Sequence, residues 1–267
     1  MLSIEVKPIE GNMYNYIIMF NNQYYIIRKG DFATDANKKI YYSLFSICLC
    51  VEEYIQSHST YCLYIIICST LVWTVIEIIL HTTKTRVIKP MYITDMYRKK
   101  HLIPRPISIF LQGFQEGGVV TTFGLYFGDR LNNTTYLIAF HLFIAYIIRN
   151  MNSKQNISKV ASKRQINTVG SLCTMGLITL HNGIPLYRYT EHFQRQLNMF
   201  IVITYVCSIW TYIAYTKGFR TIETRILGEN GTIIKSGDHI DALFILGYDV
   251  IFEISIAYLT FYNWFIL

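Results

Sequence analysis

The stretch YCLYIIICSTLVWTVIEIIL, residues Tyr61–Leu80, decides the fold. It holds 20 residues, of which only Glu77 is charged. A helix of that length rises about 30 Å, which matches the hydrocarbon core of a bilayer. We therefore interpret Tyr61–Leu80 as a membrane-spanning helix.

Further apolar runs before and after this stretch bring the expected spans to about seven. They cover residues 40–54, 107–127, 136–148, 168–180, 197–215 and 240–267. The run at 168–180 is the weakest, because His181-Asn182-Gly183 follows about 13 apolar residues and full length requires continuation towards Leu186. With 52% hydrophobic residues and a mean hydropathy of +0.29, the sequence predicts an all-α polytopic membrane protein whose helical bundle occupies residues 40–267.

Basic residues separate the connecting segments into two classes. Segments 1–39, 82–105, 149–167 and 217–239 hold 21 of the 24 lysines and arginines. The alternating segments hold only Arg130, Arg188 and Arg195. Cytoplasmic loops of membrane proteins retain Lys and Arg, so we expect a cytosolic N-terminus, cytosolic loops 82–105, 149–167 and 217–239, and a C-terminus outside.

Two cytosolic segments show hairpin patterns. In the N-terminal segment 1–39, the strand-like runs Tyr14–Phe20 and Gln23–Ile27 flank the turn pair Asn21-Asn22. Phe219–Gly237 shows a second hairpin pattern around Gly228-Glu-Asn-Gly231. The two pieces could pair into a small cytosolic sheet, while the alternative for the first is an interfacial amphipathic segment.

Composition limits the partners and the redox chemistry. The net charge of +7 falls in short loops without a recognition motif, so we expect membrane lipids, with anionic lipid on the cytosolic side, and no nucleic acid. The six cysteines lack zinc or thioredoxin spacing. The N-terminus lacks a signal-peptide pattern, so the first span is expected to direct insertion into an endomembrane or plasma membrane.

Four asparagines begin glycosylation sequons. Asn132 and Asn133 lie in an expected outer loop and are possible glycosylation sites, whereas Asn156 and Asn230 lie in expected inner loops.

Small residues form a stripe on the third expected span. Gly113, Gly117, Thr121, Gly124 and Gly128 are spaced by three or four positions, which places them on one helix face. Such a face lets another helix approach closely. Internal packing is the first interpretation, and a homo-oligomer formed through the Gly113/Gly117/Gly124/Gly128 face is the second.

Polar side chains, most of them ionisable, recur in four of the expected spans. Such residues are costly in a membrane and usually face the bundle interior or water. Their depths overlap on the cytosolic side, so we expect them to converge. They are Glu77 and His81, Gln112 and Glu116, His141, and Asp249 and Glu253.

Two chemistries suit such a group. Glu116, Asp249, Glu253 and His141 could act as catalytic acid–base groups. Glu77 and His81, one helical turn apart, could join them as ligands of a divalent metal that activates water. The structural alternative for Glu77 and His81 is pairing with Lys84 or Arg86 at the headgroup level.

Three function classes remain open. The first is a membrane-embedded enzyme that acts on a lipid or lipid-linked substrate near the cytosolic leaflet. The second is a structural or assembly membrane protein without catalysis, and the third is a small proton-coupled transporter, although no inverted repeat is visible. A retinal protein is excluded because Ile240–Leu267 contains no lysine.

Overall fold

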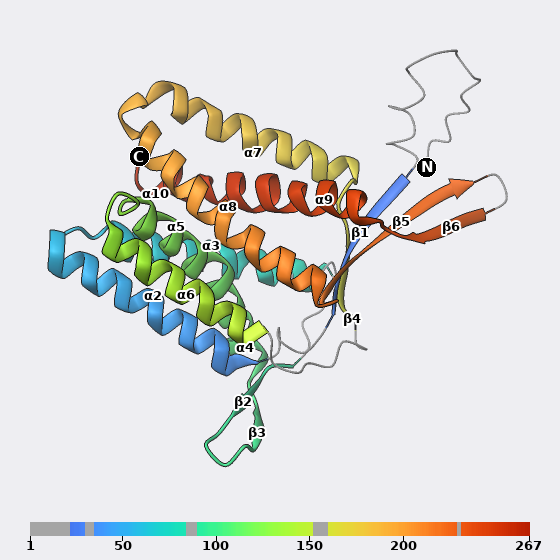
Figure 1. Cartoon of the computed structure of the whole chain (residues 1–267), viewed down its shortest axis with the longest axis horizontal. Coiled ribbons are helices and arrows are strands. Elements are labelled where there is room, and N and C mark those ends of the chain that lie inside the picture. The colour runs from blue at the N-terminus through green and yellow to red at the C-terminus, as the bar shows by residue number, and fades with distance from the viewer. Residues whose placement is uncertain (1–21, 30–34, 84–89, 152–159, 229–230) are drawn as a thin grey trace.

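The chain is mostly helical, and its helices run back and forth between two ends. The computed structural model describes residues 22–29, 35–83, 90–151, 160–228 and 231–267. Along the chain, the helical segments alternate in direction between the end that carries the β-strands and the opposite end (Figure 1). They are α2 (Ala36–Ser57), α3 (Tyr61–Thr82), the continuous α4 (Arg105–Gly113), η2 (Phe114–Val119) and α5 (Val120–Gly128), α6 (Thr134–Met151), α7 (Val169–Arg188), η3 (Thr190–His192) with α8 (Phe193–Thr216), and the continuous α9 (His239–Tyr248), η4 (Asp249–Ile256) and α10 (Ala257–Phe265).

Three segments are long and apolar enough to cross a membrane. They are Tyr61–Thr82, Thr190–Thr216 and His239–Phe265. These three of the seven expected spans are therefore confirmed as candidate spans. The others form helices that are shorter or more polar: Glu52 and Glu53 lower the hydropathy of α2, and Gln112, Gln115 and Glu116 lower that of α4–η2–α5.

The weakest expected span, 168–180, is longer than its apolar run. It forms α7, which continues through His181-Asn182-Gly183 to Arg188 and includes Pro185. Asn182 stays inside the helix because its side chain is buried and donates to the Ile256 carbonyl oxygen over 2.8 Å. A tertiary contact therefore supports a polar residue that interrupts the local apolar pattern.

The helices expose apolar side chains and bury polar ones. Exposed leucines and phenylalanines include Leu71 on α3, Leu177 and Leu180 on α7, and Leu243 and Phe244 on α9. Fully enclosed polar side chains include those of Ser46, Ser69, Thr121 and Gln196. Large exposed apolar surfaces require a partner such as a membrane. This distribution and the three candidate spans are compatible with an integral membrane protein.

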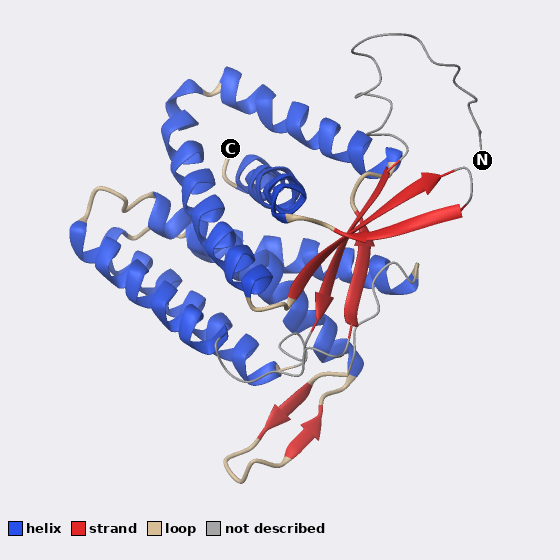
Figure 2. Ribbon diagram, turned by 45° about the vertical axis from the view of Figure 1, so that its right-hand side comes forward, coloured by secondary structure: helices blue, strands red, loops and turns tan. Residues whose placement is uncertain are grey.

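A four-stranded antiparallel sheet covers one end of the bundle (Figure 2). Its strand order is β4-β1-β5-β6, built from β4 (Val160–Gln165), β1 (Asn22–Lys29), β5 (Arg220–Gly228) and β6 (Gly231–Ser236). The β5–β6 hairpin and the pairing of β1 with β5 confirm the expected hairpin at Phe219–Gly237 and its association with the N-terminal segment. The chain is therefore mostly helical with small β elements, so the all-α prediction with a possible β-hairpin is confirmed only in part.

Only the second strand of the predicted N-terminal hairpin lies among the described residues, where it forms part of β1. Asn22 pairs with Ile226 as part of β1 and is not a turn residue. The Tyr14–Phe20 run lies outside the described residues. Among those described, the partners of β1 are β5 and β4, and the sequence did not reveal β4 because VASKRQ is a polar run without apolar alternation.

A second, two-stranded sheet was also missed. Its strands are β2 (Tyr92–Thr94) and β3 (Lys100–Leu102), and they form a hairpin within the basic segment 82–105. Their three-residue length and the charged turn between them conceal the strand pattern in the sequence.

The glycine stripe is packed inside the chain. A Cβ atom at Gly117 would meet the Ser69 carbonyl oxygen and, at 2.7 Å, the Trp73 Cβ atom, both on α3. At Gly128 it would lie 3.0 Å from the backbone nitrogen of Met199 on α8. The internal-packing interpretation is therefore confirmed, and the face proposed for homo-oligomerisation is already covered by α3 and α8.

Candidate functional site

Three arginines lie on the inner face of the four-stranded sheet. Side chains alternate between the two faces of a strand, and residues paired across strands share a face. Arg28 pairs with Arg220, and Arg164 pairs with Ile26. Because Ile26 and Arg28 are two positions apart on β1, all three arginines lie on the face that also carries the buried Ile26 and Ile222.

Three carboxylates reach towards this face from two π-helical segments. Glu116 belongs to η2, and Asp249 and Glu253 belong to η4. A π-helical turn contains more residues than an α-helical turn, and such turns inside α-helices are frequent at functional sites. In η4, Ser255 donates its hydroxyl to the carbonyl oxygen of Val250, five positions earlier.

Asp249 is enclosed between two arginines. Arg220 donates to Asp249 Oδ2 over 2.8 Å, and Arg164 donates to Asp249 Oδ1 over 2.6 Å. Arg220 also donates to the hydroxyl of Thr211 on α8 over 3.0 Å. The exposed fractions of the Arg220 and Asp249 side chains are only 5% and 2%. A buried carboxylate with this many charge-assisted hydrogen bonds holds the sheet and the bundle together.

Glu253 shares one of these arginines. Arg164 donates to Glu253 Oε2 as well as to Asp249, and Ser171, at the start of α7, donates to Glu253 Oε1 over 3.4 Å. The Arg164 side chain is 41% exposed, so the arginine that binds both carboxylates is accessible from the protein surface.

Glu116 is held by an aromatic and an amide side chain. The Trp73 indole donates to Glu116 Oε2 over 3.0 Å, and the Gln112 amide donates to Glu116 Oε1. The buried Lys39 in turn donates to Gln112 Oε1 over 2.7 Å, which fixes the amide orientation. The Glu116 side chain remains 21% exposed.

Arg28 links the two carboxylate groups. Its guanidinium lies 3.9 Å from Glu116 Oε1, and it also lies within electrostatic range of Asp249. We call these six residues the charge cluster. They are Arg28, Arg164, Arg220, Glu116, Asp249 and Glu253. The expected convergence of Glu116 with Asp249 and Glu253 therefore exists, but arginines from the sheet mediate it.

Glu77 and His81 form a local pair on α3. Both are buried, and His81 Nε2 lies 3.9 Å from Glu77 Oε2, as their four-residue spacing predicts. Lys84 and Arg86, the partners considered in the structural alternative, lie outside the described residues.

No candidate metal centre is found in the described part of the chain. No group of three or more His, Cys, Asp or Glu side chains there is arranged to hold a metal ion. The carboxylates nearest to one another in the charge cluster are bound to arginines, which compete with a cation for the same oxygens. The predicted ligand set of Glu77 and His81 with the deeper carboxylates is therefore not assembled in the structure.

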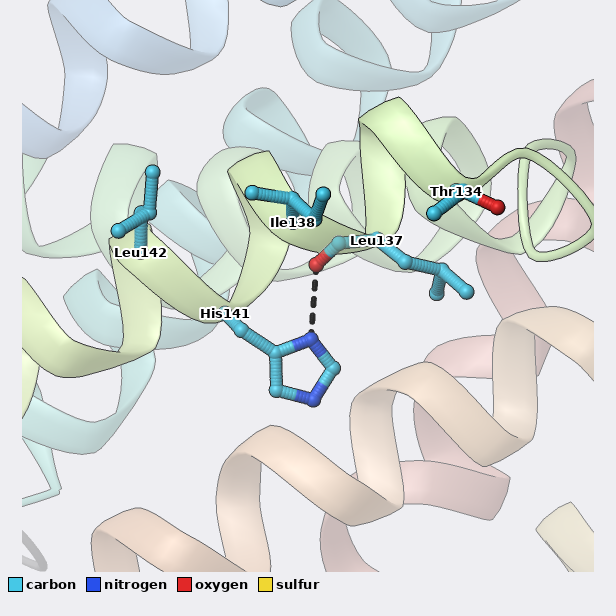
Figure 3. Close-up of a pocket in the computed structure, with 5 residues that line it drawn as sticks. All are labelled: Thr134, Leu137, Ile138, His141 and Leu142. Carbon is cyan, nitrogen blue, oxygen red and sulfur yellow. Dashed lines mark hydrogen bonds between the residues drawn. The ribbon is translucent and has the colours of Figure 1, made fainter.

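His141 lies on the outer surface of α6, away from the inner face of the sheet. Its Nδ1 atom is bonded to the Leu137 carbonyl oxygen over 2.7 Å, and its Nε2 atom lies 3.4 Å from the Tyr205 hydroxyl on α8. It lines an open hollow with Thr134, Leu137, Ile138 and Leu142 (Figure 3). The expectation that His141 joins the carboxylates is therefore wrong, because its helix directs the ring to the exterior.

Asn132 and Asn133 are exposed at the end of the bundle opposite the sheet. The Asn133 side chain accepts a hydrogen bond from the backbone N–H of Thr135 over 3.0 Å, at the start of α6. Nearby, Asp129 forms a two-point pair with Arg195 at 2.8 and 2.6 Å. This end therefore carries paired charges and short connections.

The outer face of the sheet is polar and separate from the charge cluster. Glu223 accepts from Lys163 over 2.5 Å and from Arg225 over 2.8 Å. These hydrogen bonds lower the pKa of the Glu223 carboxyl below its usual range. The same two cations lie over the ring of Tyr25.

Arg28, Arg164 and Arg220 were not predicted as site residues, because in the sequence they stand out only as charges in connecting segments. A usable signal was the basic residue two positions from an isoleucine in each strand: Ile26 with Arg28, Arg164 with Ile166, and Arg220 with Ile222. With period-two alternation, that spacing places a cation on the apolar face of a strand, where it needs a buried partner.

Fold and site together define a mostly helical protein (73%) with three candidate membrane spans and an arginine–carboxylate site at the sheet end. Comparison of the chain with protein-family models, curated proteins and solved structures finds no match.

Proposed function

We propose that this chain is an integral, multi-pass membrane protein and that its charge cluster binds and processes the head group of a lipid or lipid-linked substrate at the cytosolic leaflet. The single observation that carries the proposal is the position of the charge cluster. It lies where the apolar helices meet the polar sheet, and its Arg164, Arg28 and Glu116 side chains are partly exposed. Head groups occupy that depth of a bilayer.

The distribution of charge between the two ends of the bundle supports the proposed membrane placement. The described parts of the four basic segments adjoin the end of the bundle that carries the strands, whereas α5 and α7 end, and α8 begins, at the opposite end (Figure 1). Arg130, Arg188 and Arg195 lie at or near these last three helix termini. This supports the seven-span arrangement with a cytosolic sheet, because positively charged segments remain in the cytosol.

The accessible arginines support the proposed substrate class. Arg164 and Arg28 are both partly exposed, and guanidinium groups bind phosphate through two parallel hydrogen bonds. A phosphate that approaches them would share the arginines with Glu253 and Glu116. The head group is therefore expected to be anionic.

Glu116 is the best placed acid–base group. It is oriented by Trp73 and Gln112, remains partly exposed, and has one carboxylate oxygen 3.9 Å from the Arg28 guanidinium. Asp249, in contrast, is enclosed by two arginines and serves the structure. We assign proton transfer to Glu116, head-group binding to Arg164 and Arg28, and anchoring to Asp249 and Arg220.

A structural protein without catalysis is the second candidate. It is favoured by the enclosed Arg220–Asp249–Arg164 arrangement, which joins β5, β4 and η4 whether or not a substrate binds.

One experiment separates the two candidates. The full chain is purified in mild detergent and its bound lipids are identified by mass spectrometry, then it is reconstituted in liposomes made from a total lipid extract. The proposal predicts that Arg164→Gln lowers bound anionic lipid. Glu116→Gln should retain that lipid but lose any change in head-group masses over time.

Arg225→Gln, on the outer face of the sheet, is the matched control and should leave both readouts unchanged. Equal bound lipid in wild type and Arg164→Gln, together with no head-group conversion by wild type, would refute the enzymatic proposal and favour the structural candidate.

A further inference from the structure

The β2–β3 hairpin is a protrusion with an unusual surface. It leaves the bundle sideways beside the start of α2, away from the four-stranded sheet (Figures 1 and 2). Met96 and Tyr97 at its tip are 99% and 86% exposed. Arg98, Lys99 and Lys100 follow directly, so large apolar and cationic side chains are presented together.

The same arrangement continues along one face of the hairpin. Tyr92 pairs with Leu102 and Thr94 with Lys100, so these four side chains share a face. Tyr92 and Leu102 are both exposed. The hairpin therefore presents an exposed apolar pair near its base and the Met96-Tyr97 pair at its tip, with the cations between and beside them.

The hairpin is held in a fixed shape at the end of β2 and within its turn. Beside the last residue of β2, the Asn37 side chain on α2 accepts from the Thr94 N–H over 2.7 Å and donates to the Thr94 carbonyl oxygen over 2.9 Å. At the turn, Asp95 accepts from the backbone N–H of Lys99 over 2.8 Å and pairs with His101 over 2.9 Å. These hydrogen bonds fix the position of the backbone that carries the exposed apolar side chains.

We propose that this hairpin rests on the anionic lipid surface at the sheet side of the bundle. Met96 and Tyr97 would enter the headgroup layer, while Arg98, Lys99 and Lys100 pair with lipid phosphates. Tyrosine is favoured at that depth, and clustered basic residues next to a span bind anionic lipid. The proposal rests on the membrane placement given above.

The direction in which the β2–β3 hairpin extends favours the membrane surface as its binding partner. A hairpin that continued along the helix axes would point into the cytosol. This one extends laterally from the end of the bundle, so in the proposed placement it lies along the leaflet. Its one acidic turn residue, Asp95, is already engaged by His101 and by the Lys99 N–H, which leaves a cationic surface towards the lipid.

The test uses the full chain in lipid nanodiscs and hydrogen–deuterium exchange. Two disc compositions are compared: phosphatidylcholine alone, and phosphatidylcholine with about 30% phosphatidylserine. Exchange of the 92–102 peptides should be slower by about tenfold in the anionic discs. Lys99→Glu with Lys100→Glu, or about 0.5 M NaCl, should remove the difference.

A second variant tests the apolar tip and a third serves as control. Met96→Ser with Tyr97→Ser should also reduce the protection. Lys235→Glu, an exposed charge change on β6 at the edge of the four-stranded sheet, should leave it intact.

Two results would overturn the proposal. One is equal exchange of the 92–102 peptides in both disc compositions. The other is protection that appears in neutral discs only after an acidic polypeptide such as polyglutamate is added, which would assign the surface to an acidic protein. Protected α3 peptides together with an unprotected hairpin would defeat this inference alone, whereas unprotected α3 peptides would defeat the membrane placement itself.

Discussion

Arg220 on β5 donates to Asp249 in η4 over 2.8 Å, and both side chains are almost completely enclosed. Arg164 on β4 donates to the other oxygen of the same carboxylate, although Arg164 and Asp249 are 85 positions apart in the sequence. A single buried carboxylate thus joins two strands of the sheet to the last helical segment of the bundle.

Asp249→Asn should destabilise the protein strongly. The neutral amide leaves Arg220 buried without its counter-charge, and loss of one partner of a buried pair costs about 3–5 kcal/mol. Thermal unfolding in detergent should show a clearly lower Tm. Glu223→Gln, which breaks pairs on the outer face of the sheet, should cost less than about 1 kcal/mol. Equal effects of the two changes would show that the enclosed pair does not anchor the sheet.

Gly117→Ala should disturb the contact between η2 and α3. The added methyl group would meet the Ser69 carbonyl oxygen and the Trp73 Cβ atom, so overpacking should cost about 1–3 kcal/mol. Gly176→Ala on α7 is the control, because beyond the adjacent backbone of its own helix no atom lies within 4 Å of its added Cβ. That variant should be neutral or slightly more stable, since alanine is the better helix former. A neutral Gly117→Ala would contradict the packing of the glycine stripe.

Acid should weaken the outer face of the sheet through Glu223. Hydrogen bonds from Lys163 and Arg225 lower its pKa in the folded protein. The folded state therefore binds fewer protons than the unfolded state, and this contribution to stability is complete above the ordinary glutamate value of 4.5. It is lost as pH falls through the lowered folded pKa. The readout is the protection factor of the β4 and β5 amides, which is the ratio of the intrinsic to the observed exchange rate at each pH. From pH 6 downwards it should fall in wild type, and the fall should be smaller in Glu223→Gln.

Labelling from one side of the membrane should distinguish the two ends of the bundle. In intact cells, a membrane-impermeant maleimide should modify Asn132→Cys and spare Lys235→Cys, and permeabilisation should make both reactive. The wild-type chain supplies the background from its native cysteines, of which Cys48 and Cys173 are exposed. Modification of Lys235→Cys in unpermeabilised cells would reverse the proposed orientation.

Local sequence patterns predicted the helices better than they predicted the charge cluster. Tyr61–Leu80 and Ile240–Leu267 correspond closely to described helices, since each is a long apolar run whose backbone hydrogen bonds are satisfied within the helix. The β5–β6 hairpin was also predictable from its Gly228 and Gly231 turn. The strand β4 was not, because its pairing with β1 joins residues about 140 positions apart and leaves no local pattern.

The carboxylates of the site were visible in the sequence as costly residues inside apolar runs, and Glu116, Asp249 and Glu253 do converge. His141 was assigned to the same group from its depth alone, yet its ring faces the exterior of α6. Depth along a helix can be counted from the sequence, whereas the direction of a side chain around the helix depends on which neighbours pack against it.

By itself, the sequence determined the helical segments, their alternation between a basic and a nearly neutral end, and the positions of the polar residues within them. These properties follow from short-range hydrophobic and charge patterns. Only the tertiary structure decided that three arginines from three strands neutralise the three carboxylates. That outcome depends on strand register and on π-helical turns, which place side chains far apart in the sequence within hydrogen-bonding distance.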